Sequence, residues 1–380
     1  MRVPCARTDL PLTHALALAG RVSMSVKKKK TSVTANEEIT SQHVGILGGG
    51  AWGTALAQSA RRAGRDVTLW AYEFETVDEL NAHHTNRVYL PGIKLDPAIK
   101  ATAKAKEVAS ADILLFVAPS QFVRAVAEEL APHIRPGQPI VVCTKGFEES
   151  TGSLMTEVVR SVLPAASIAA LSGPSFAGEV ARNLPVALTL ACSGKELDRR
   201  LTAALAHRSF RIYWTDDVIG TQVGGAVKNV LAIAAGIVEG RHLGASAHAA
   251  VTTRGFAELV RFGLQLGARF ETLTGLSGLG DLILTCSNSQ SRNMSLGQAL
   301  GQGKSLEEIL GARKSITEGV HSVRSVVALA RKHNVEMPIC EAVNEVIAGN
   351  IGVDDAIESV LARPFRAEAD YPSMAAHLLV

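Results

Sequence analysis

The stretch Val44–Gly53, VGILGGGAWG, decides the fold of this chain. The apolar run His43–Leu47 leads directly into the glycines, and a helical pattern follows them. Strand, glycine turn and helix come in the order that holds a dinucleotide. In this fingerprint Gly48 permits the tight turn, Gly50 admits the pyrophosphate close to the backbone, and Gly53 lets the helix pack against the strand. We therefore expect the amides at the start of the helix to face phosphate groups.

The context of the glycines separates this prediction from its alternative, an ordinary glycine-rich turn. A second apolar run, Asp66–Trp70, follows the helical pattern and completes a strand–helix–strand unit. The glycine pattern alone is weak evidence, and the complete unit is what favours dinucleotide binding.

Length and composition indicate a soluble globular protein of two domains. The chain has 380 residues, of which 47% are hydrophobic and 20% are charged. The net charge of +3 is misleading, because residues 1–30 hold seven basic side chains and one acid. The rest of the chain is therefore acidic overall, and charge gives no argument for nucleic-acid binding.

Residues 1–41 lack sustained hydrophobic periodicity and include the basic run Lys27–Lys30. We interpret them as a disordered extension, with Met24 as an alternative start of the chain. The apolar stretch Ala15–Gly20 is too short for the core of a secretory signal, whereas a transit peptide stays open because the segment has arginines and a single acid.

The five cysteines are odd in number and scattered, with no CxxC pair. They predict free thiols in a reducing cytoplasm. The eleven histidines form no HExxH motif or clustered ligand set, so we expect no metal site.

Short apolar runs alternate with amphipathic segments as far as Trp214. This alternation predicts an α/β Rossmann-like domain over residues 42–215, with a doubly wound parallel sheet covered on both faces. Ligands of such sheets bind beyond the carboxyl ends of the strands. Besides the two runs above, the predicted strands are Asp112–Val117, Pro139–Cys143, Ile168–Ser172, Val186–Ala191 and Phe210–Trp214.

Beyond Thr215 the pattern changes to long helical segments and strand signals almost vanish. We expect an all-helical C-terminal domain over residues 216–366, followed by a tail at 367–380. The predicted helices are Asp217–Glu239, Ala247–Leu266, Glu318–His333 and Pro338–Ala348.

The helix Asp217–Glu239 contains one charged side chain between its terminal acids, Lys228. Asn229 and a Gly224-Gly225 pair argue against a membrane span and favour a buried helix facing a cleft. An apolar setting lowers the pKa of a lysine, which suits Lys228 to proton transfer near neutral pH. The alternative is a lysine whose stem lies along apolar surface and whose charge reaches water.

Three other polar groups are candidates for chemistry. Lys145 follows a predicted strand, where a cation polarises a carbonyl or holds a phosphate, unless it is an ordinary exposed loop lysine. Asp281 lies in an apolar stretch and needs a cationic partner. Ser291-Arg292-Asn293 precedes a helical run, where hydroxyl, guanidinium and amide groups suit a phosphate, although a helix N-cap alone would explain Ser291 or Asn293.

At these residues the sequence closely resembles the bacterial-type NAD(P)-dependent glycerol-3-phosphate dehydrogenases. The resemblance spans about residues 43–365 in family order. The matching blocks are GGGAWGTALA, VAPSQ, CTKGFE, LSGPSFAGE, GGAVKNVLAIAAGI, TTRGFAE, GLGDLILTC, QSRN and ITEG.

The resemblance implies reversible reduction of dihydroxyacetone phosphate to sn-glycerol 3-phosphate, the backbone precursor of phospholipids. It implies that Lys228 donates and accepts the proton and that Lys145 contacts both substrate and cofactor, with Asp281 as the third catalytic residue. The remaining substrate contacts that it implies are Gly173, Ser175, Asp281, Ser291, Arg292 and Asn293. The cofactor contacts that it implies, besides the three glycines, are Ala51, Trp52, Tyr72, Ala177, Arg292, Ile316 and Glu318.

The choice between NAD and NADP stays open. The dinucleotide fingerprint expects an acid after the second strand for the ribose, or an arginine for a 2′-phosphate. Here Tyr72 stands where many family members have Arg or His. The acid Glu73 lies slightly further along the chain than the fingerprint expects.

Two alternatives to this function remain. One is a reductase of another 2-keto or 3-hydroxy acid on a similar scaffold, which would bind a carboxylate instead of a phosphate. The other is a non-catalytic NAD(P)-binding sensor, which would have no reason to keep a lysine inside an apolar helix. The expected partners are a phosphorylated small molecule and a second copy of the chain in a homodimer, with neither nucleic acid nor stable membrane insertion.

Overall fold

The computed structural model describes residues 42–312 and 317–364. The predicted extension at 1–41, with Cys5 and Met24, and the tail at 367–380 lie outside the described residues, as does the last part of the predicted helical domain, residues 365–366.

Eight strands form one sheet in the order β3-β2-β1-β4-β5-β6-β7-β8. The first six strands in this order give the dinucleotide-binding topology, in which the order reverses between β1 and β4. All seven predicted strands are present, and β3 was missed because three residues carry too little pattern. The strands are β1 (His43–Leu47), β2 (Asp66–Trp70), β3 (Lys100–Thr102), β4 (Ile113–Phe116), β5 (Pro139–Val142), β6 (Ser167–Ser172), β7 (Val186–Cys192) and β8 (Phe210–Thr215).

One strand pair corrects the prediction of a parallel sheet, because β6 and β7 are antiparallel. Their connection contains only a five-residue helix, α6 (Ala177–Ala181). Such a helix is about 8 Å long, whereas a six-residue strand is about 20 Å long, so the connection does not return the chain to the start of the sheet. The prediction of a doubly wound α/β fold is otherwise confirmed.

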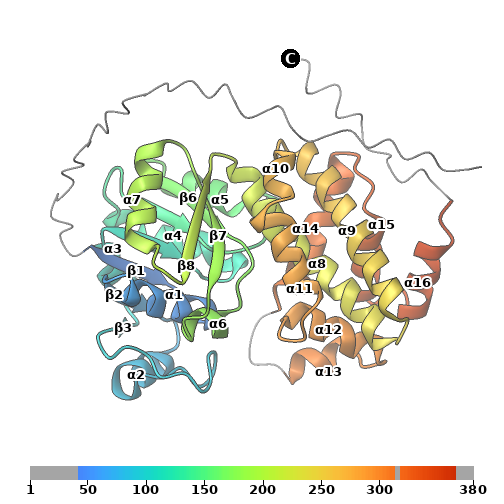
Figure 1. The fold of residues 1–380 in the computed structure, drawn as a ribbon, viewed down its shortest axis with the longest axis horizontal. Helices are drawn as coiled ribbons and strands as arrows, with labels where there is room; N and C mark the ends of the chain where they lie inside the picture. The colour runs from blue at the N-terminus through green and yellow to red at the C-terminus, as the bar shows by residue number, and fades with distance from the viewer. Residues whose placement is uncertain (1–41, 313–316, 365–380) are drawn as a thin grey trace, which may run out of the picture. The chain divides into compact units, whose positions relative to one another are not determined.

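Both faces of the sheet are buried at its centre, as the alternation along β4 shows. Ile113 and Leu115 belong to one apolar core, whereas Leu114 and Phe116 belong to another on the opposite face. The helices between the strands cover these faces (Figure 1). They are α1 (Ala51–Arg62), α2 (Phe74–His83), α3 (Ala105–Ala109), the 3₁₀ turns η1 (Ser120–Phe122) and η2 (Ala131–His133), α4 (Val123–Leu130), α5 (Met155–Val162), α6 and α7 (Lys195–Leu205).

The described chain beyond β8 is helical, as predicted, and Figure 1 colours it from yellow to red. Its four long predicted helices are all present within about two residues of the expected ends. The elements are α8 (Val218–Gly240), α9 (Ala245–Gln265), α10 (Phe270–Leu273), the π-helix η3 (Leu276–Gly280), α11 (Asp281–Cys286), α12 (Arg292–Gly301), α13 (Leu306–Gly311), α14 (Glu318–Lys332), α15 (Pro338–Ile347) and α16 (Val353–Leu361).

Helix α8 is the centre of the helical core. It is long and apolar enough to cross a membrane, but 94% of its most apolar window is buried inside the fold. The prediction of a buried helix is therefore confirmed. Phe147 of the loop after β5 joins the same core and meets Phe262 edge to face, with ring centroids 6.1 Å apart.

Helices α8 and α12 touch backbone to backbone through facing glycines. A Cβ added at Gly236 would lie 2.1 Å from the carbonyl oxygen of Met294, and one at Gly297 would lie 2.1 Å from that of Ile233. The two helices would have to move apart by about the width of a side chain to relieve such contacts. The glycines therefore fix how the start of α12 is placed relative to Lys228 on α8.

We expect Gly236→Ala to destabilise the protein by about 1–3 kcal/mol, because the added methyl group overpacks this contact. Urea unfolding followed by circular dichroism measures the loss. Gly311→Ala at the end of α13 is the matched control, because a Cβ there meets nothing within 4 Å. Equal stability of the two variants would contradict the close-contact explanation.

Candidate active site

A cavity of about 950 Å³ lies at the carboxyl ends of the parallel strands and is closed by α8, α11, α12 and α14. It brings together nearly all of the predicted site residues. The lining residues that were predicted are Gly48, Gly50, Ala51, Trp52, Gly53, Tyr72, Lys145, Ser175, Ala177, Lys228, Asp281, Ser291, Arg292, Asn293 and Glu318. Ile316 lies outside the described residues, and Gly173 lies just behind the wall of the cavity.

The glycine turn has the form that a dinucleotide needs. A Cβ at Gly53 would lie 1.9 Å from the carbonyl oxygen of Gly48, so only glycine allows α1 to begin this close to β1. A Cβ at Gly50 would meet nothing within 4 Å, which leaves the cavity side of the turn open to a ligand. No side chain caps the start of α1, so its first amides are available to an anion. The residues present therefore fit a bound dinucleotide.

Lys228 is buried, and its amine is hydrogen-bonded to two polar side chains. Its Nζ donates to Asp281 Oδ1 at 2.8 Å and to Thr285 Oγ1 at 2.7 Å. Burial lowers the pKa of the amine to about 8, with Asp281 opposing the shift and Lys145 adding to it. A pKa lowered in this way suits the amine to proton transfer near neutral pH, and its burial rules out a lysine whose charge reaches bulk water along the protein surface.

Asp281 joins the two lysines. Its other oxygen, Oδ2, accepts from Lys145 Nζ at 2.5 Å, and its side chain is 1% exposed. One carboxylate between two ammonium groups leaves the cluster with a net positive charge when both lysines are protonated. Such a cluster suits an anionic substrate and a developing negative charge on oxygen.

Close backbone packing places Asp281. The π-helix η3 directly precedes it, and π-helical turns often occur at functional sites. The turn lies against α8 at Gly224, where a Cβ would be 2.4 Å from the carbonyl oxygen of Ser277. The adjacent Gly225 lies against the stem of Lys145 in the same way. The glycine pair beside Lys228 therefore lets both partners of the charged cluster approach the helix.

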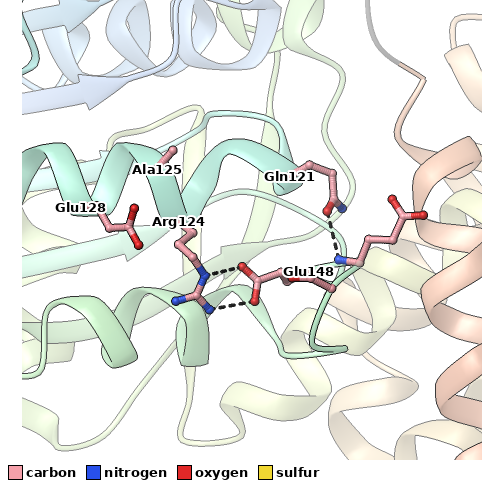
Figure 2. Close-up of a pocket in the computed structure, with 7 residues that line it drawn as sticks. Gln121, Arg124, Ala125, Glu128 and Glu148 are labelled. Atoms are coloured by element: carbon pink, nitrogen blue, oxygen red, sulfur yellow. Dashed lines mark hydrogen bonds and ion pairs between the residues drawn. The ribbon is translucent and has the colours of Figure 1, made fainter.

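Lys145 stands on a loop that is tied down on its outer side. Figure 2 shows two of these ties, at Arg124 and at Gln121, in a second, more open pocket of about 500 Å³. Arg124 donates to both carboxylate oxygens of Glu148 at 2.7 and 2.8 Å. The side chain of Gln121 accepts from the amide of Glu149 at 3.0 Å and donates to the carbonyl of Phe147 at 3.0 Å. These hydrogen bonds hold the loop in place. Lys145 itself lines the larger cavity and is not an ordinary exposed lysine.

The Ser291-Arg292-Asn293 segment begins α12 at the cavity wall. Ser291 caps the helix by accepting from the amide of Met294 at 3.2 Å, so the N-cap interpretation holds for this residue. Asn293 donates to Asn229 Oδ1 at 3.0 Å and accepts from the amide of Gly319 at 2.9 Å. It therefore ties α12 to α8 and α14. Arg292 is exposed and lines the cavity.

The loop after β6 reaches the site mainly through its backbone. The carbonyl of Gly173 accepts from Lys145 Nζ at 3.3 Å and from the hydroxyl of Ser175 at 3.2 Å. Gly173 therefore holds Lys145, whereas Ser175 and Ala177 line the cavity itself.

Glu318, at the start of α14, also lines the cavity. Ser120 donates to its carboxylate at 3.0 Å, and burial raises the pKa of the Glu318 carboxyl.

Sequence reasoning missed two polar groups of the site, Thr285 and Asn229. Thr285 lies four residues after Asp281, which places both on one face of α11, and this spacing was a usable signal. Asn229 follows Lys228 in an otherwise apolar helix, and the sequence analysis used it only to argue against a membrane span. Its partner Asn293 is 64 residues away, which no local pattern reveals.

Within residues 42–312 and 317–364, no group of three or more His, Cys, Asp or Glu side chains is arranged to hold a metal. The four cysteines in the described ranges, Cys143, Cys192, Cys286 and Cys340, are free and buried.

Two family models match the chain. The NAD-dependent glycerol-3-phosphate dehydrogenase N-terminus matches residues 43–198, and the C-terminus of the same family matches residues 217–358. A glycerol-3-phosphate dehydrogenase (NAD(P)+) of Parvibaculum lavamentivorans is 59% identical over 325 residues, which cover 86% of this chain and 98% of the relative. That of Caulobacter vibrioides is 57% identical over 331 residues, 87% of this chain and all of the relative.

Among solved structures, glycerol-3-phosphate dehydrogenase from Coxiella burnetii superimposes with a TM-score of 0.82 at 40% identity. The match covers 85% of this chain and 99% of that one. The resemblance found in the sequence blocks is therefore confirmed across both halves of the described chain. The chain belongs to the family of NAD-dependent glycerol-3-phosphate dehydrogenases.

Proposed function

We infer that the chain reduces dihydroxyacetone phosphate to sn-glycerol 3-phosphate with NADH or NADPH, reversibly, and so supplies glycerophospholipid synthesis. The observation that carries this inference is the charged cluster of Lys228, Asp281 and Lys145 in one cavity with the glycine turn. A dinucleotide site beside a proton-exchanging amine is the arrangement that carbonyl reduction requires.

The cofactor would be held by the glycine turn, the first amides of α1, and the cavity residues Tyr72, Ala177, Arg292 and Glu318. When bound in its reduced form, it supplies the hydride for the carbonyl carbon. The proton and the positive charges that the reaction needs come from the chain's own side chains.

Lys228 provides the proton. Its ammonium group donates a hydrogen bond to the C2 carbonyl oxygen and then transfers a proton to that oxygen as the alcohol forms. Asp281 holds the amine in place and, together with Thr285, limits where it points. Lys145, tied to the other oxygen of Asp281, adds positive charge near the same oxygen of the substrate.

The phosphate would be bound where Arg292 faces the cavity at the start of α12. A guanidinium presents paired donors that match phosphate oxygens, and a helix start favours negative charge. Ser291, Asn293 and Ser175 line the same region and complete the proposed phosphate and hydroxyl contacts. A panel of dihydroxyacetone phosphate and carboxylate keto acids tests this reading. Activity with a keto acid but none with dihydroxyacetone phosphate would favour the alternative reductase.

The reaction should depend on pH in opposite ways in its two directions. Reduction needs the Lys228 ammonium, whose pKa burial lowers to about 8, so kcat should fall about tenfold per pH unit above that pKa. Oxidation of glycerol 3-phosphate needs the neutral amine, so its kcat should rise up to the same pH. Steady-state kcat at saturating substrates from pH 6 to 10 measures both limbs. A reduction rate that stays level from pH 7 to 10 would contradict the role of Lys228.

We also propose that the chain acts in the cytoplasm as a homodimer and that residues 42–215 and 216–366 are its two domains. Light scattering of the purified protein tests the oligomeric state. The cytoplasmic assignment is supported by the free cysteines and by the burial of its one long apolar helix in the described chain.

A further inference from the structure

The carboxylate of Glu73, which follows β2, and the phenol of Tyr89 both line the cavity. Glu73 is exposed, lines the cavity, and precedes the first residue of α2. The backbone places it beside the glycine turn, because the amide of Gly48 donates to the carbonyl of Trp70, the last residue of β2. In dinucleotide-binding folds an acid at the end of the second strand binds the ribose of the adenosine half, and Glu73 stands three residues past that end.

The side chain of Glu73 is held by Tyr89, which also lines the cavity. The hydroxyl of Tyr89 donates to Glu73 Oε1 at 2.9 Å. The Tyr89 segment is anchored to the glycine turn through Asn86, whose side chain donates to the carbonyl of Gly49 at 2.8 Å and accepts from the amide of Tyr89 at 3.2 Å. A chain of hydrogen bonds therefore connects the carboxylate to the backbone that would hold the pyrophosphate.

The charges around this end of the cavity are negative. Among the described residues that line the cavity, the cationic side chains are Lys145, Lys228 and Arg292, and none of them comes from β2, α2 or the segment that holds Tyr89. The nearest basic residue in sequence to Tyr89 is Arg87, which does not line the cavity and is bonded to Glu79 at 2.8 Å. A 2′-phosphate at this end would therefore meet Glu73, and none of the described lining residues of this end carries a positive charge to offset it.

We propose that Glu73, positioned by Tyr89, makes this chain select NADH over NADPH. The inference rests on the proposed function for the identity of the cofactor, and it settles the choice that the sequence left open. A ribose hydroxyl donates to the carboxylate oxygens, whereas a 2′-phosphate only accepts and repels them. Glu73 is the specificity-determining residue, and Tyr89 is a positioning residue that acts through it.

The first test is nucleotide binding, measured by isothermal titration calorimetry of the full chain without substrate. We expect NADH to bind about 10- to 100-fold more tightly than NADPH. Glu73→Gln removes the charge and keeps the shape, and it should reduce this ratio about tenfold, mainly by strengthening NADPH binding. Glu75→Gln is the matched control, because Glu75 is also exposed near the start of α2 but does not line the cavity. It should leave the ratio unchanged.

The second test is kinetic and uses dihydroxyacetone phosphate with each nucleotide. Tyr89→Phe should raise KM for NADH about three- to tenfold while changing kcat less, because the phenol orients the carboxylate and does not meet the reacting atoms. KM for NADPH should not rise in this variant. A general loss of structure would raise both KM values.

Two results would overturn the proposal: equal or tighter binding of NADPH by the wild type, or the same ratio in Glu73→Gln and wild type. Because the first test measures nucleotide binding without substrate, its result does not depend on the proposed reaction. A chain that binds NADH selectively but does not reduce dihydroxyacetone phosphate would refute the function and support the selectivity.

Discussion

Lys228→Ala is expected to lower kcat for reduction of dihydroxyacetone phosphate by about 10³- to 10⁵-fold. The variant loses the proton donor, which contributes about 10²–10⁴, and a positive charge at the developing oxyanion, which contributes about 10²–10³. The two effects come from one group and overlap, so they do not multiply fully. The protein should still fold, because Lys145 remains as the ion-pair partner of Asp281.

The measurement is kcat from NADH oxidation, together with NADH affinity from titration calorimetry. Affinity should stay within about threefold, because the glycine turn and Glu73 are intact. Lys100→Ala on β3 is the control, since Lys100 is exposed and lies outside the cavity. A Lys228→Ala enzyme that keeps a tenth or more of wild-type turnover would show that another group donates the proton.

Asp281→Asn should lower kcat by about 10²- to 10³-fold. Asparagine keeps the size of the side chain but removes the charge between two ammonium groups. Lys145 and Lys228 then repel each other, and the pKa of Lys228 falls further because Asp281 no longer opposes its desolvation. Less of the ammonium form is present at neutral pH, and the amine is held less firmly.

The pH profile separates this positioning role from simple damage to the fold. The pH above which reduction slows should move below that of the wild type, whereas a merely destabilised protein keeps its profile at lower amplitude. Asp78→Asn, at an exposed position on α2, is the control for removal of one carboxylate. An Asp281→Asn enzyme with an unshifted profile would contradict the coupling between the two residues.

Most of the fold could be predicted from the sequence because its signals are local. The apolar runs that gave the central strands β1, β4 and β5 lie buried, and β1, the glycine turn and α1 follow in the expected order. The antiparallel β7 was not predictable from its own residues, because an apolar strand carries no mark of its direction. The short helices η3 and α11 were missed as well, since their five and six residues show too little periodicity.

The site was predicted as a set of residues, but its connections were not. Lys228 attracted attention as the one charge within an apolar helix, and Asp281 as an acid that needs a cation. The carboxylate of Asp281 pairs with two lysines that lie 53 and 136 residues away in the sequence. This pairing depends on tertiary packing, which no sequence motif predicts. The structural roles of Asn293 and Gly173 could not be predicted either, because their hydrogen-bond partners lie on other elements.

The most direct test of the account is a crystal structure of the chain with NADH and glycerol 3-phosphate, a pair that cannot react because both are reduced. The account predicts that Lys228 Nζ lies about 2.6–3.2 Å from the C2 hydroxyl oxygen, with Asp281 still bonded to the amine and the phosphate at Arg292. A complex in which that oxygen lies beyond hydrogen-bonding distance of Lys228 and bonds to another proton donor would contradict it.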